Sequence, residues 1–289
     1  MSKANLTNMS KNEIRFTKMH GIGNDYIYIN CLDEEPDNLP QLSMRLSDRH
    51  TGIGGDGIIL ICPSDCADFK MRIFNADGSE AKMCGNGSRC VGKYVFDKRL
   101  TDKKTITLET LAGIKTLVLH TKDNLVESVT VDMGCPNLNP ADIPVIATAE
   151  RVVEAPVETS RGTTAITAVS MGNPHGVIFT EDLSTDNVHH LGAELERHPM
   201  WPDRANIEFA RIDSPEHITM RVWERGSGET MACGTGACAT AIAAAVTGRV
   251  GRKVTVSLPG GDLGIEWSTD GHVYMTGGAT TVFEGTIEI

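Results

Sequence analysis

The sequence predicts an α+β fold made of two related halves. Residues 71–87 (MRIFNADGSEAKMCGNG) align without a gap with residues 220–236 (MRVWERGSGETMACGTG), which places Cys84 over Cys233. Segments rich in β-branched residues dominate both halves, whereas helical patterns are few. A doubly wound parallel sheet would need more helices than this sequence offers, so an α+β arrangement is favoured.

The repeat has a constant offset of 149 residues, which is the separation of Cys84 from Cys233. Two further pairs of segments match at that offset: 23–24 (GN) with 172–173 (GN), and 103–110 (KKTITLET) with 252–259 (RKVTVSLP). Three separated matches in one register indicate an internal duplication. Two domains also suit the length of 289 residues.

The halves meet near residues 136–144 (PNLNPADIP), where proline and asparagine are typical of a linker. We therefore expect an N-terminal domain at residues 14–135, completed by a last strand at 278–289. The C-terminal domain is expected at residues 136–277.

Each half is expected to contain several strands and one helix. The predicted strands are 26–30, 57–61, 70–74, 105–110, 129–133, 165–170, 176–179, 218–223, 254–258 and 273–277. The predicted helices follow the two Cys-Gly-x-Gly turns, at 88–97 and 237–248, and the second ends on a glycine suited to a C′ cap. That second helix is apolar or small on nearly every face, so it belongs inside a core.

Composition excludes several classes of protein. A hydrophobic content of 40% with 22% charged residues is typical of a globular chain without a transmembrane span. The formal charge of -11 disfavours binding to nucleic acid or to anionic membranes, because both attract basic patches. Residues 1–13 are polar and lack the apolar core of a secretory signal. We expect a cytoplasmic protein that acts on a small molecule.

The eight cysteines are expected to be free thiols, because a cytosolic chain of this size is kept reduced. Six of them have no repeated surroundings and are interpreted as small buried apolar residues: Cys31, Cys62, Cys66, Cys90, Cys135 and Cys238. Cys84 and Cys233 differ, because each stands where a helix begins. Unpaired N–H groups and the helix dipole there favour a thiolate, so we expect a lowered pKa and a usable base.

Two other interpretations of these motifs are weaker. The glycine-rich stretches, including residues 51–57 (TGIGGDG), could cradle a phosphate, but a Walker lysine pattern and a complete G-x-G-x-x-G are both missing. The cysteine spacings do not form the C-x-x-C pairs of structural zinc sites, so we expect no metal. No motif for pyridoxal phosphate is evident, and we expect no cofactor.

Two thiols related by a pseudo-twofold axis could flank a bound molecule from opposite sides. One would remove a proton as thiolate and the other would donate one as thiol, which is what inversion of a stereocentre requires. The carbanion formed next to a carboxylate is unstable, so the two helix ends would also have to stabilise charge. The duplication therefore predicts a racemase or epimerase.

The chain resembles the diaminopimelate epimerases, which interconvert L,L- and meso-2,6-diaminopimelate without a cofactor. The resemblance covers FTKMHGIGNDYI, RHTGIGGDGI, FNADGSEAKMCGNGSRC, MGNPHGVIF, NIEFARI and WERGSGETMACGTGACA, and so nearly the whole chain. It implies two pseudo-symmetric domains, each a mixed or antiparallel barrel-like sheet around a central helix, with the active site in the cleft between them. It also implies a homodimer and a role in lysine and peptidoglycan precursor synthesis.

The resemblance further implies that Cys84 and Cys233 are the acid/base thiols and that His175 and Glu224 tune them. The implied substrate contacts are Asn24, Asn75, Gly85, Asn86, Asn173, Asn206, Glu224, Arg225, Gly234 and Thr235. Chemistry supports part of this set, since the guanidinium of Arg225 can grip a distant carboxylate and Glu224 can take an ammonium.

Each of these assignments has a structural alternative. Glu224 and Arg225 could form a solvated surface pair. Asn24 and Asn173 could be left-handed turn residues, although their matched offset favours the site. His175 could be an ordinary buried histidine as readily as a group that tunes the thiols.

Gly57 departs from the family pattern, in which many relatives carry a glutamine or similar side chain. It is the repeat partner of Asn206, so one polar substrate contact is expected to be missing or supplied by backbone.

Two rival functions remain at this stage. A proline or hydroxyproline racemase would share the two thiols, but such enzymes typically carry histidine where Asn86 stands and have no need of Arg225. A non-catalytic thiol sensor would use Cys84 and Cys233 as a reversible disulfide.

Overall fold

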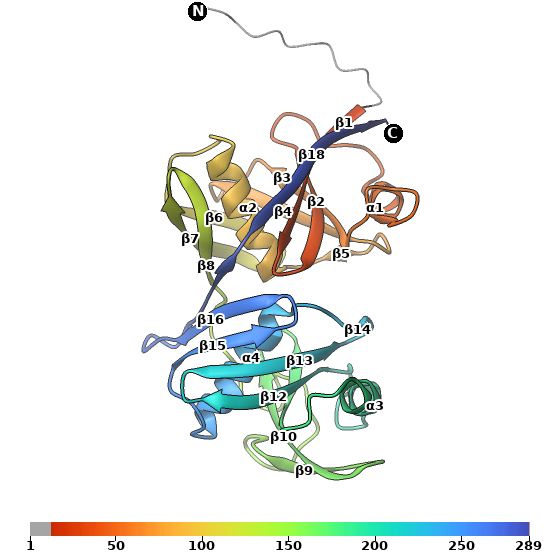
Figure 1. Cartoon of the computed structure of the whole chain (residues 1–289), viewed down its shortest axis with the longest axis vertical. Helices are drawn as coiled ribbons and strands as arrows, with labels where there is room; N and C mark the ends of the chain where they lie inside the picture. Colours follow the sequence, from red (N-terminus) through yellow and green to blue (C-terminus); the bar gives the residue numbers. More distant parts are fainter. Residues whose placement is uncertain (1–12, 289) are drawn as a thin grey trace, which may run out of the picture.

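The computed structural model describes residues 13–288, so nearly all of the predicted polar leader lies outside the described residues. Figure 1 shows two lobes stacked along the long axis, joined by strands and by one irregular connection. No helix within residues 13–288 is long and apolar enough to cross a membrane.

The first lobe contains the N-terminal half of the chain and the last strand. Its strands are β1 (Glu13–Gly21), β2 (Asn24–Asn30), β3 (Gly57–Cys62), β4 (Phe69–Asn75), β5 (Glu80–Ala81), β6 (Thr105–Thr110), β7 (Gly113–Lys122), β8 (Leu125–Asp132) and β18 (Thr280–Glu288). Its helices are α1 (Leu39–Ser47) and α2 (Gly85–Asp97).

The second lobe repeats this order. Its strands are β9 (Ala155–Thr159), β10 (Gly162–Ser170), β11 (Pro174–Phe179), β12 (Asn206–Ser214), β13 (His217–Glu224), β14 (Gly228–Glu229), β15 (Lys253–Leu258), β16 (Gly261–Trp267) and β17 (Val273–Gly278). Its helices are α3 (Thr185–Glu196) and α4 (Gly234–Val246). Both ends of α4 lie 149 residues after the ends of α2, as the repeat predicts.

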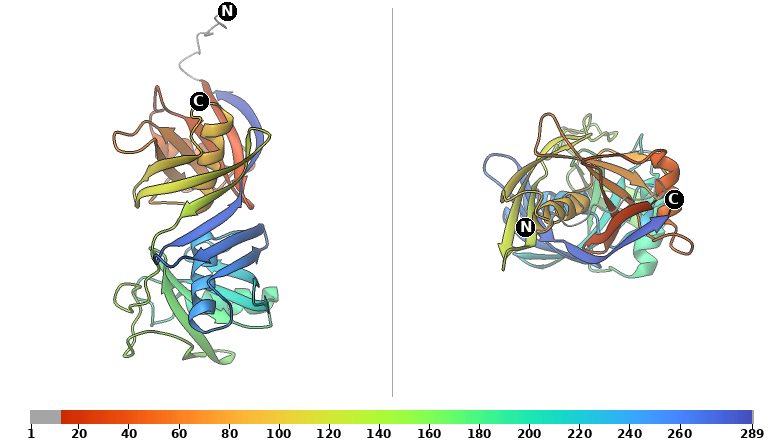
Figure 2. Two further views of the ribbon diagram at one scale, coloured as in Figure 1. Left: turned by 90° about the vertical axis from the view of Figure 1, so that its left-hand side faces the viewer. Right: turned by 90° about the horizontal axis from the view of Figure 1, so that it is seen from above.

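Strand pairing forms one continuous ribbon that is nearly symmetric about its middle. It runs β18-β1-β2-β3-β4-β6-β7-β8 in the first lobe and then β17-β16-β15-β13-β12-β11-β10-β9 in the second. The lobes join where β8 pairs antiparallel with β17. The ribbon mixes parallel and antiparallel pairs, and in the right-hand view of Figure 2 its strands surround α2.

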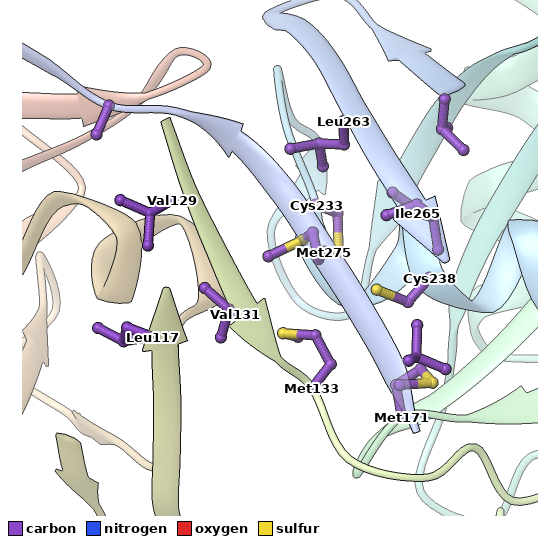
Figure 3. Close-up of a cluster of buried hydrophobic side chains, with 14 of the residues drawn as sticks. Leu117, Val129, Val131, Met133, Met171, Cys233, Cys238, Leu263, Ile265 and Met275 are labelled. Carbon is purple, nitrogen blue, oxygen red and sulfur yellow. The ribbon is translucent and has the colours of Figure 1, made fainter. Parts of the chain in front are cut away.

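The two repeated helices are both largely enclosed, although their compositions differ. Nearly all residues of α4 are apolar or small, whereas α2 also buries the polar side chains of Asn86, Ser88 and Arg89. Most residues of α2 and α4 are buried, and the two helices contact each other. One hydrophobic core continues through both lobes. Figure 3 shows it at the junction, where Met133 and Met275 lie between Val131 of one lobe and Ile265 of the other.

All ten strands expected from the sequence are present, and both expected helices begin three residues earlier than predicted. Helices α1 and α3 were not predicted. Each packs outside the ribbon over a smaller core, where a single apolar stripe suffices. The expectation of burial is wrong for Cys66 and Cys135, which are exposed, and correct for the other four cysteines of that group; all eight are free.

Candidate active site

Cys84 is the N-cap of α2, so the helix itself positions its sulfur. Its backbone is extended, and its Sγ accepts a hydrogen bond from the N–H of Gly87 at 3.3 Å. The thiol also lies 3.3 Å from Oδ1 of Asn24, the first residue of β2. A Cβ at position 87 would lie 2.6 Å from Cδ1 of Ile59, so a larger residue there would have to displace the end of that side chain. The sulfur is thus held by the first turn of α2 and by β2.

Cys233 occupies the equivalent N-cap position of α4, again with an extended backbone. Only 5% of the residue is exposed. Its Sγ lies 3.6 Å from the hydroxyl of Thr235, and a Cβ at Gly236 would lie 3.2 Å from it. The duplication therefore places both thiols at the start of a buried helix, as the sequence indicates.

The predicted lowering of the thiol pKa values is wrong for the protein without substrate. Burial raises the pKa of the Cys84 thiol, although the Gly87 N–H and the charge of Arg89 act in the opposite direction. Burial, followed by the carboxylates of Glu224 and Glu208, raises the pKa of Cys233 well above its usual range. Loss of water around a charged sulfur outweighs the favourable helix end.

The two helix starts meet around Asn86 and Met275. The Asn86 side chain donates to the carbonyl of Ala232, which directly precedes Cys233, at 3.4 Å. The Met275 side chain fills the space beside both first helical residues, since a Cβ at Gly85 would lie 2.7 Å from its Cε and a Cβ at Gly234 3.1 Å from its Sδ. Figure 3 shows Met275 next to Cys233. The structure thus brings the predicted Gly85, Asn86 and Gly234 together.

The predicted asparagines of the first lobe differ in their contacts. Asn24 touches Cys84 through Oδ1 and donates through Nδ2 to Asp56 at 2.7 Å. Asn75, the last residue of β4, donates to the hydroxyl of Ser79 at 3.1 Å and contacts neither thiol through a hydrogen bond. Asp56 was not predicted, and it holds Asn24 in place.

Gly57 has no room for a side chain. A Cβ there would lie 2.1 Å from the carbonyl oxygen of Phe74 and 2.9 Å from the ring of Tyr26. The departure from the family pattern therefore leaves only backbone at this position.

Glu224 and Arg225 do not form a pair with each other, so the alternative of a solvated surface pair does not describe them. Glu224 is partly buried at the end of β13 and accepts a hydrogen bond from Thr230. Burial raises the pKa of the Glu224 carboxyl, while Thr230 and the Cys233 thiol act to lower it. Arg225 is exposed, and its guanidinium donates to the carbonyl of Asp203 at 3.1 Å.

Asn206 is buried and positions the segment that carries Arg225. Its Oδ1 accepts from the Arg225 N–H at 2.9 Å, and its Nδ2 donates to the carbonyl of Pro174 at 3.2 Å. Both ends of the amide are therefore bound within the protein.

His175 belongs to a chain of polar contacts that ends at Cys233. Its Nδ1 lies 2.6 Å from Oε1 of Glu208, and its Nε2 lies 3.0 Å from Oδ1 of Asn173. Asn173 Nδ2 is 3.5 Å from the hydroxyl of Thr235, which neighbours the Cys233 sulfur. His175 therefore reaches the thiol through Asn173 and Thr235 rather than by direct contact.

Glu208 is the residue of this chain that sequence analysis missed. Its side chain is fully buried, and a Cβ at Gly236 would lie 2.7 Å from Oε1. Among the described residues, its Oε2 is one of the few buried side-chain atoms without a hydrogen-bond partner. The available signal was a glutamate inside the apolar strand NIEFA, where the repeat partner is Ile59.

We expect Glu208→Gln to make Cys233 more reactive. The amide keeps an acceptor for His175 but removes the negative charge that disfavours a thiolate at Cys233. Alkylation of Cys233 by iodoacetamide at neutral pH, followed by peptide mass spectrometry, should accelerate at least about threefold, which corresponds to a pKa drop of about half a unit. The exposed Glu216→Gln is the matched control. An unchanged or slower rate at Cys233 would contradict this assignment.

Two surface hollows, of about 400 and 350 Å³, include no predicted site residue. One is lined by Phe179 and Arg249, and the other by Asn137 and Trp267. Within the described part of the chain, no three His, Cys, Asp or Glu side chains are grouped so as to hold a metal ion. The site is thus defined by the contacts around the two thiols.

Known proteins resemble this chain over nearly its whole length. The model of the family described as Diaminopimelate epimerase matches residues 16–139 and 167–282. Curated proteins named diaminopimelate epimerase are 52% identical over 277 residues in Acetivibrio thermocellus and 54% identical over 280 residues in Phocaeicola vulgatus. In both comparisons, 96% of this chain and 99% of the relative are covered.

Among solved structures, a phenazine biosynthesis protein of the PhzF family from Bacillus anthracis has the same fold. It superimposes with a TM-score of 0.71 at 17% identity, over 97% of this chain and 100% of that one. At this identity the likeness concerns the fold alone.

Proposed function

The chain belongs to the diaminopimelate epimerase family, and from this premise we propose that it interconverts L,L- and meso-2,6-diaminopimelate with two cysteines as its acid and base. The reaction serves lysine and peptidoglycan precursor biosynthesis and, in this scheme, uses no cofactor. The observation that carries the proposal is the placement of Cys84 and Cys233 at the starts of two pseudo-symmetric helices that meet at Asn86.

In the proposed reaction one cysteine is a thiolate and the other a thiol when substrate binds. The thiolate takes the proton from the α-carbon, and the electron pair of the broken C–H bond remains on the substrate. The thiol on the opposite face then gives its proton to that carbon, which inverts the centre. The two sulfurs have exchanged protonation states, and no net proton is gained or lost.

The substrate carboxylate at the reacting carbon is proposed to face the helix ends. The N–H groups of Gly85, Asn86, Gly234 and Thr235 are free of the intrahelical pairing that later residues have, so they can stabilise the developing negative charge.

The remaining contacts are proposed for the rest of the substrate. Glu224 would take an ammonium group, and Arg225, whose side chain is exposed, would bind the distant carboxylate. Asn24, Asn75 and Asn173 would supply polar contacts. The bound amide of Asn206 supports a positioning role for that residue.

Deuterium incorporation tests the function. Reduced protein is incubated with L,L-diaminopimelate in deuterated water in the presence of a chelator. The isomers are then separated, and their masses are measured by mass spectrometry. We expect the meso isomer to appear with deuterium at the inverted α-carbon. Exchange on proline instead of diaminopimelate would favour the racemase alternative. Exchange on neither substrate would refute both.

We also propose the division into domains at 14–135 with 278–289, and 136–277. The pairing of β18 with β1 supports this division. In the first lobe β18 pairs with β1, just as in the second lobe β9 pairs with β10.

A homodimer in the cytoplasm is proposed as well. Val282 and Phe283 of β18 are 53% and 45% exposed and give the first lobe an apolar surface that a second copy could cover. Sedimentation velocity that finds only the single-chain mass at micromolar concentration would refute the dimer.

A further inference from the structure

Arg89 is a fully buried cation close to the candidate site. It lies in α2 five residues after Cys84, and none of its surface is exposed. Two glycines leave space for it, because a Cβ at Gly21 would lie 3.0 Å from Nη2 and a Cβ at Gly277 3.1 Å from Nε. The fold thus forms a dedicated slot for a guanidinium between the first strand and the strand that crosses between lobes.

The partners of Arg89 in this slot are neutral. Nε donates to the carbonyl of Gly278 at 3.2 Å, Nη2 donates to Oδ1 of Asn86 at 2.9 Å, and Nη1 lies 3.8 Å from the sulfur of Met275. No carboxylate within residues 13–288 forms an ion pair with it. An unpaired buried charge is costly, so its retention calls for a compensating negative charge.

The groups that can supply that charge are thiols and a phenol. Cys84, Cys90, Tyr28 and Cys238 all interact favourably with the Arg89 charge when ionised. Burial raises the pKa of Cys90 to about 11 and that of Cys238 to about 12, which keeps both neutral. The pKa of the Tyr28 phenol is raised well above its usual range. Cys84 is partly exposed at the N-cap, so it ionises more readily than the other three groups.

The second lobe lacks this feature, which makes the two thiols unequal. The repeat partner of Arg89 is Cys238, 149 residues later in α4. Beneath Cys233 the structure instead places the carboxylate of Glu208, where the first lobe has Ile59. The duplicated halves therefore present a cation to one thiol and an anion to the other.

We propose that Arg89 is a positioning residue for the epimerase reaction, whose buried guanidinium balances negative charge at Cys84 while its hydrogen bond to Asn86 fixes the first turn of α2. This inference deepens the proposed function and depends on it. The other titratable groups facing Cys84 are Tyr26, Tyr28, Cys90 and Glu224, together with Asp56 behind Asn24. None of these other groups is a cation, so Arg89 is the titratable side chain whose charge can stabilise a thiolate at Cys84.

The test compares Arg89→Met with Arg89→Lys, using Cys238→Ala as the matched control at the repeat position. Alkylation of Cys84 by iodoacetamide is followed against pH by peptide mass spectrometry, which reports the thiol independently of catalysis. We expect Arg89→Met to move the midpoint upward by at least about one pH unit, so that alkylation at neutral pH slows about tenfold. The acidic limb of kcat/KM should move by the same amount, and activity should recover at high pH.

The two remaining variants should behave differently. Arg89→Lys retains the charge and is expected to shift the Cys84 midpoint by less than half as much, whereas Cys238→Ala should not shift it. If Arg89→Met does not fold, the neutral Arg89→Gln takes its place in the comparison. A midpoint within about 0.3 of a pH unit of the wild type would overturn the proposal, as would an equal loss of activity at every pH. If Arg89→Met shifts the alkylation midpoint of Cys84 but the wild-type protein does not epimerise diaminopimelate, the proposed function is refuted. The interaction between Arg89 and Cys84 would then stand without a role in epimerisation.

Discussion

Replacing either candidate thiol by serine is expected to abolish epimerisation. Serine is a favoured residue at the N-cap position that Cys84 and Cys233 occupy, so the fold should persist, but its hydroxyl is too weak an acid to become the base. We expect kcat/KM to fall by at least about 10³-fold for Cys84→Ser and for Cys233→Ser, within the usual range for a lost general acid or base. The measurement is the appearance of deuterated meso isomer from L,L-diaminopimelate.

The controls separate chemistry from folding and from oxidation. Cys66→Ser alters an exposed thiol away from the site and should leave the rate unchanged. A thermal melting temperature close to that of the wild type would show that the Cys84→Ser and Cys233→Ser proteins are folded. If either variant kept isomerising at a tenth of the wild-type rate, the two-thiol mechanism would be wrong. A thiol sensor would show no α-proton exchange in the reduced wild type.

The second large effect is expected from Gly260→Ala, in the turn between β15 and β16. A Cβ at Gly260 would lie 1.8 Å from the carbonyl oxygen of Ile22, which belongs to the turn before Asn24 in the other lobe. The Gly260 N–H also donates to the carbonyl of Met231, two residues before Cys233, at 2.9 Å. This backbone contact therefore fixes the spacing between the structures that hold the two thiols.

Alanine at position 260 has to push the Ile22 turn away, because the obstacle is backbone and cannot rotate aside. We expect kcat/KM to drop about 10²-fold, as a displacement of about 1 Å of reacting groups can cause. The stability loss should be about 1–3 kcal/mol, typical of overpacking. Gly251→Ala, at an exposed glycine with open space around it, is the control. Activity within twofold of that control would mean that this contact does not set the geometry of the site.

The internal duplication was predictable from the sequence because helix starts and turns depend on local residues. The Cys-Gly-x-Gly segments define where α2 and α4 begin, and the constant offset places Cys84 and Cys233 in equivalent surroundings. Asn24 and Asn173 could be singled out for the same reason. Strand positions followed from runs of β-branched residues, whose preference for extended backbone is local as well.

Helices α1 and α3 were not predicted because each is short and buries only one apolar stripe. Such a stripe is difficult to recognise among the polar residues of a short segment. Glu208 and Arg89 escaped for a different reason. A charged residue in an apolar segment is ordinarily placed at the surface, and only the packed structure shows that both side chains are fully buried beneath the site.

The sequence by itself thus determined the duplicated architecture, the position of Cys84 and Cys233 at the starts of two helices, and the family of this protein. The tertiary structure decided that β8 pairs with β17, that β18 returns to β1, and that the two thiols differ in charge environment. It also reversed the expected direction of the thiol pKa shifts. The physical reason is that strand pairing between distant residues and the loss of water around a sulfur depend on atoms contributed by the whole chain, which no local pattern records.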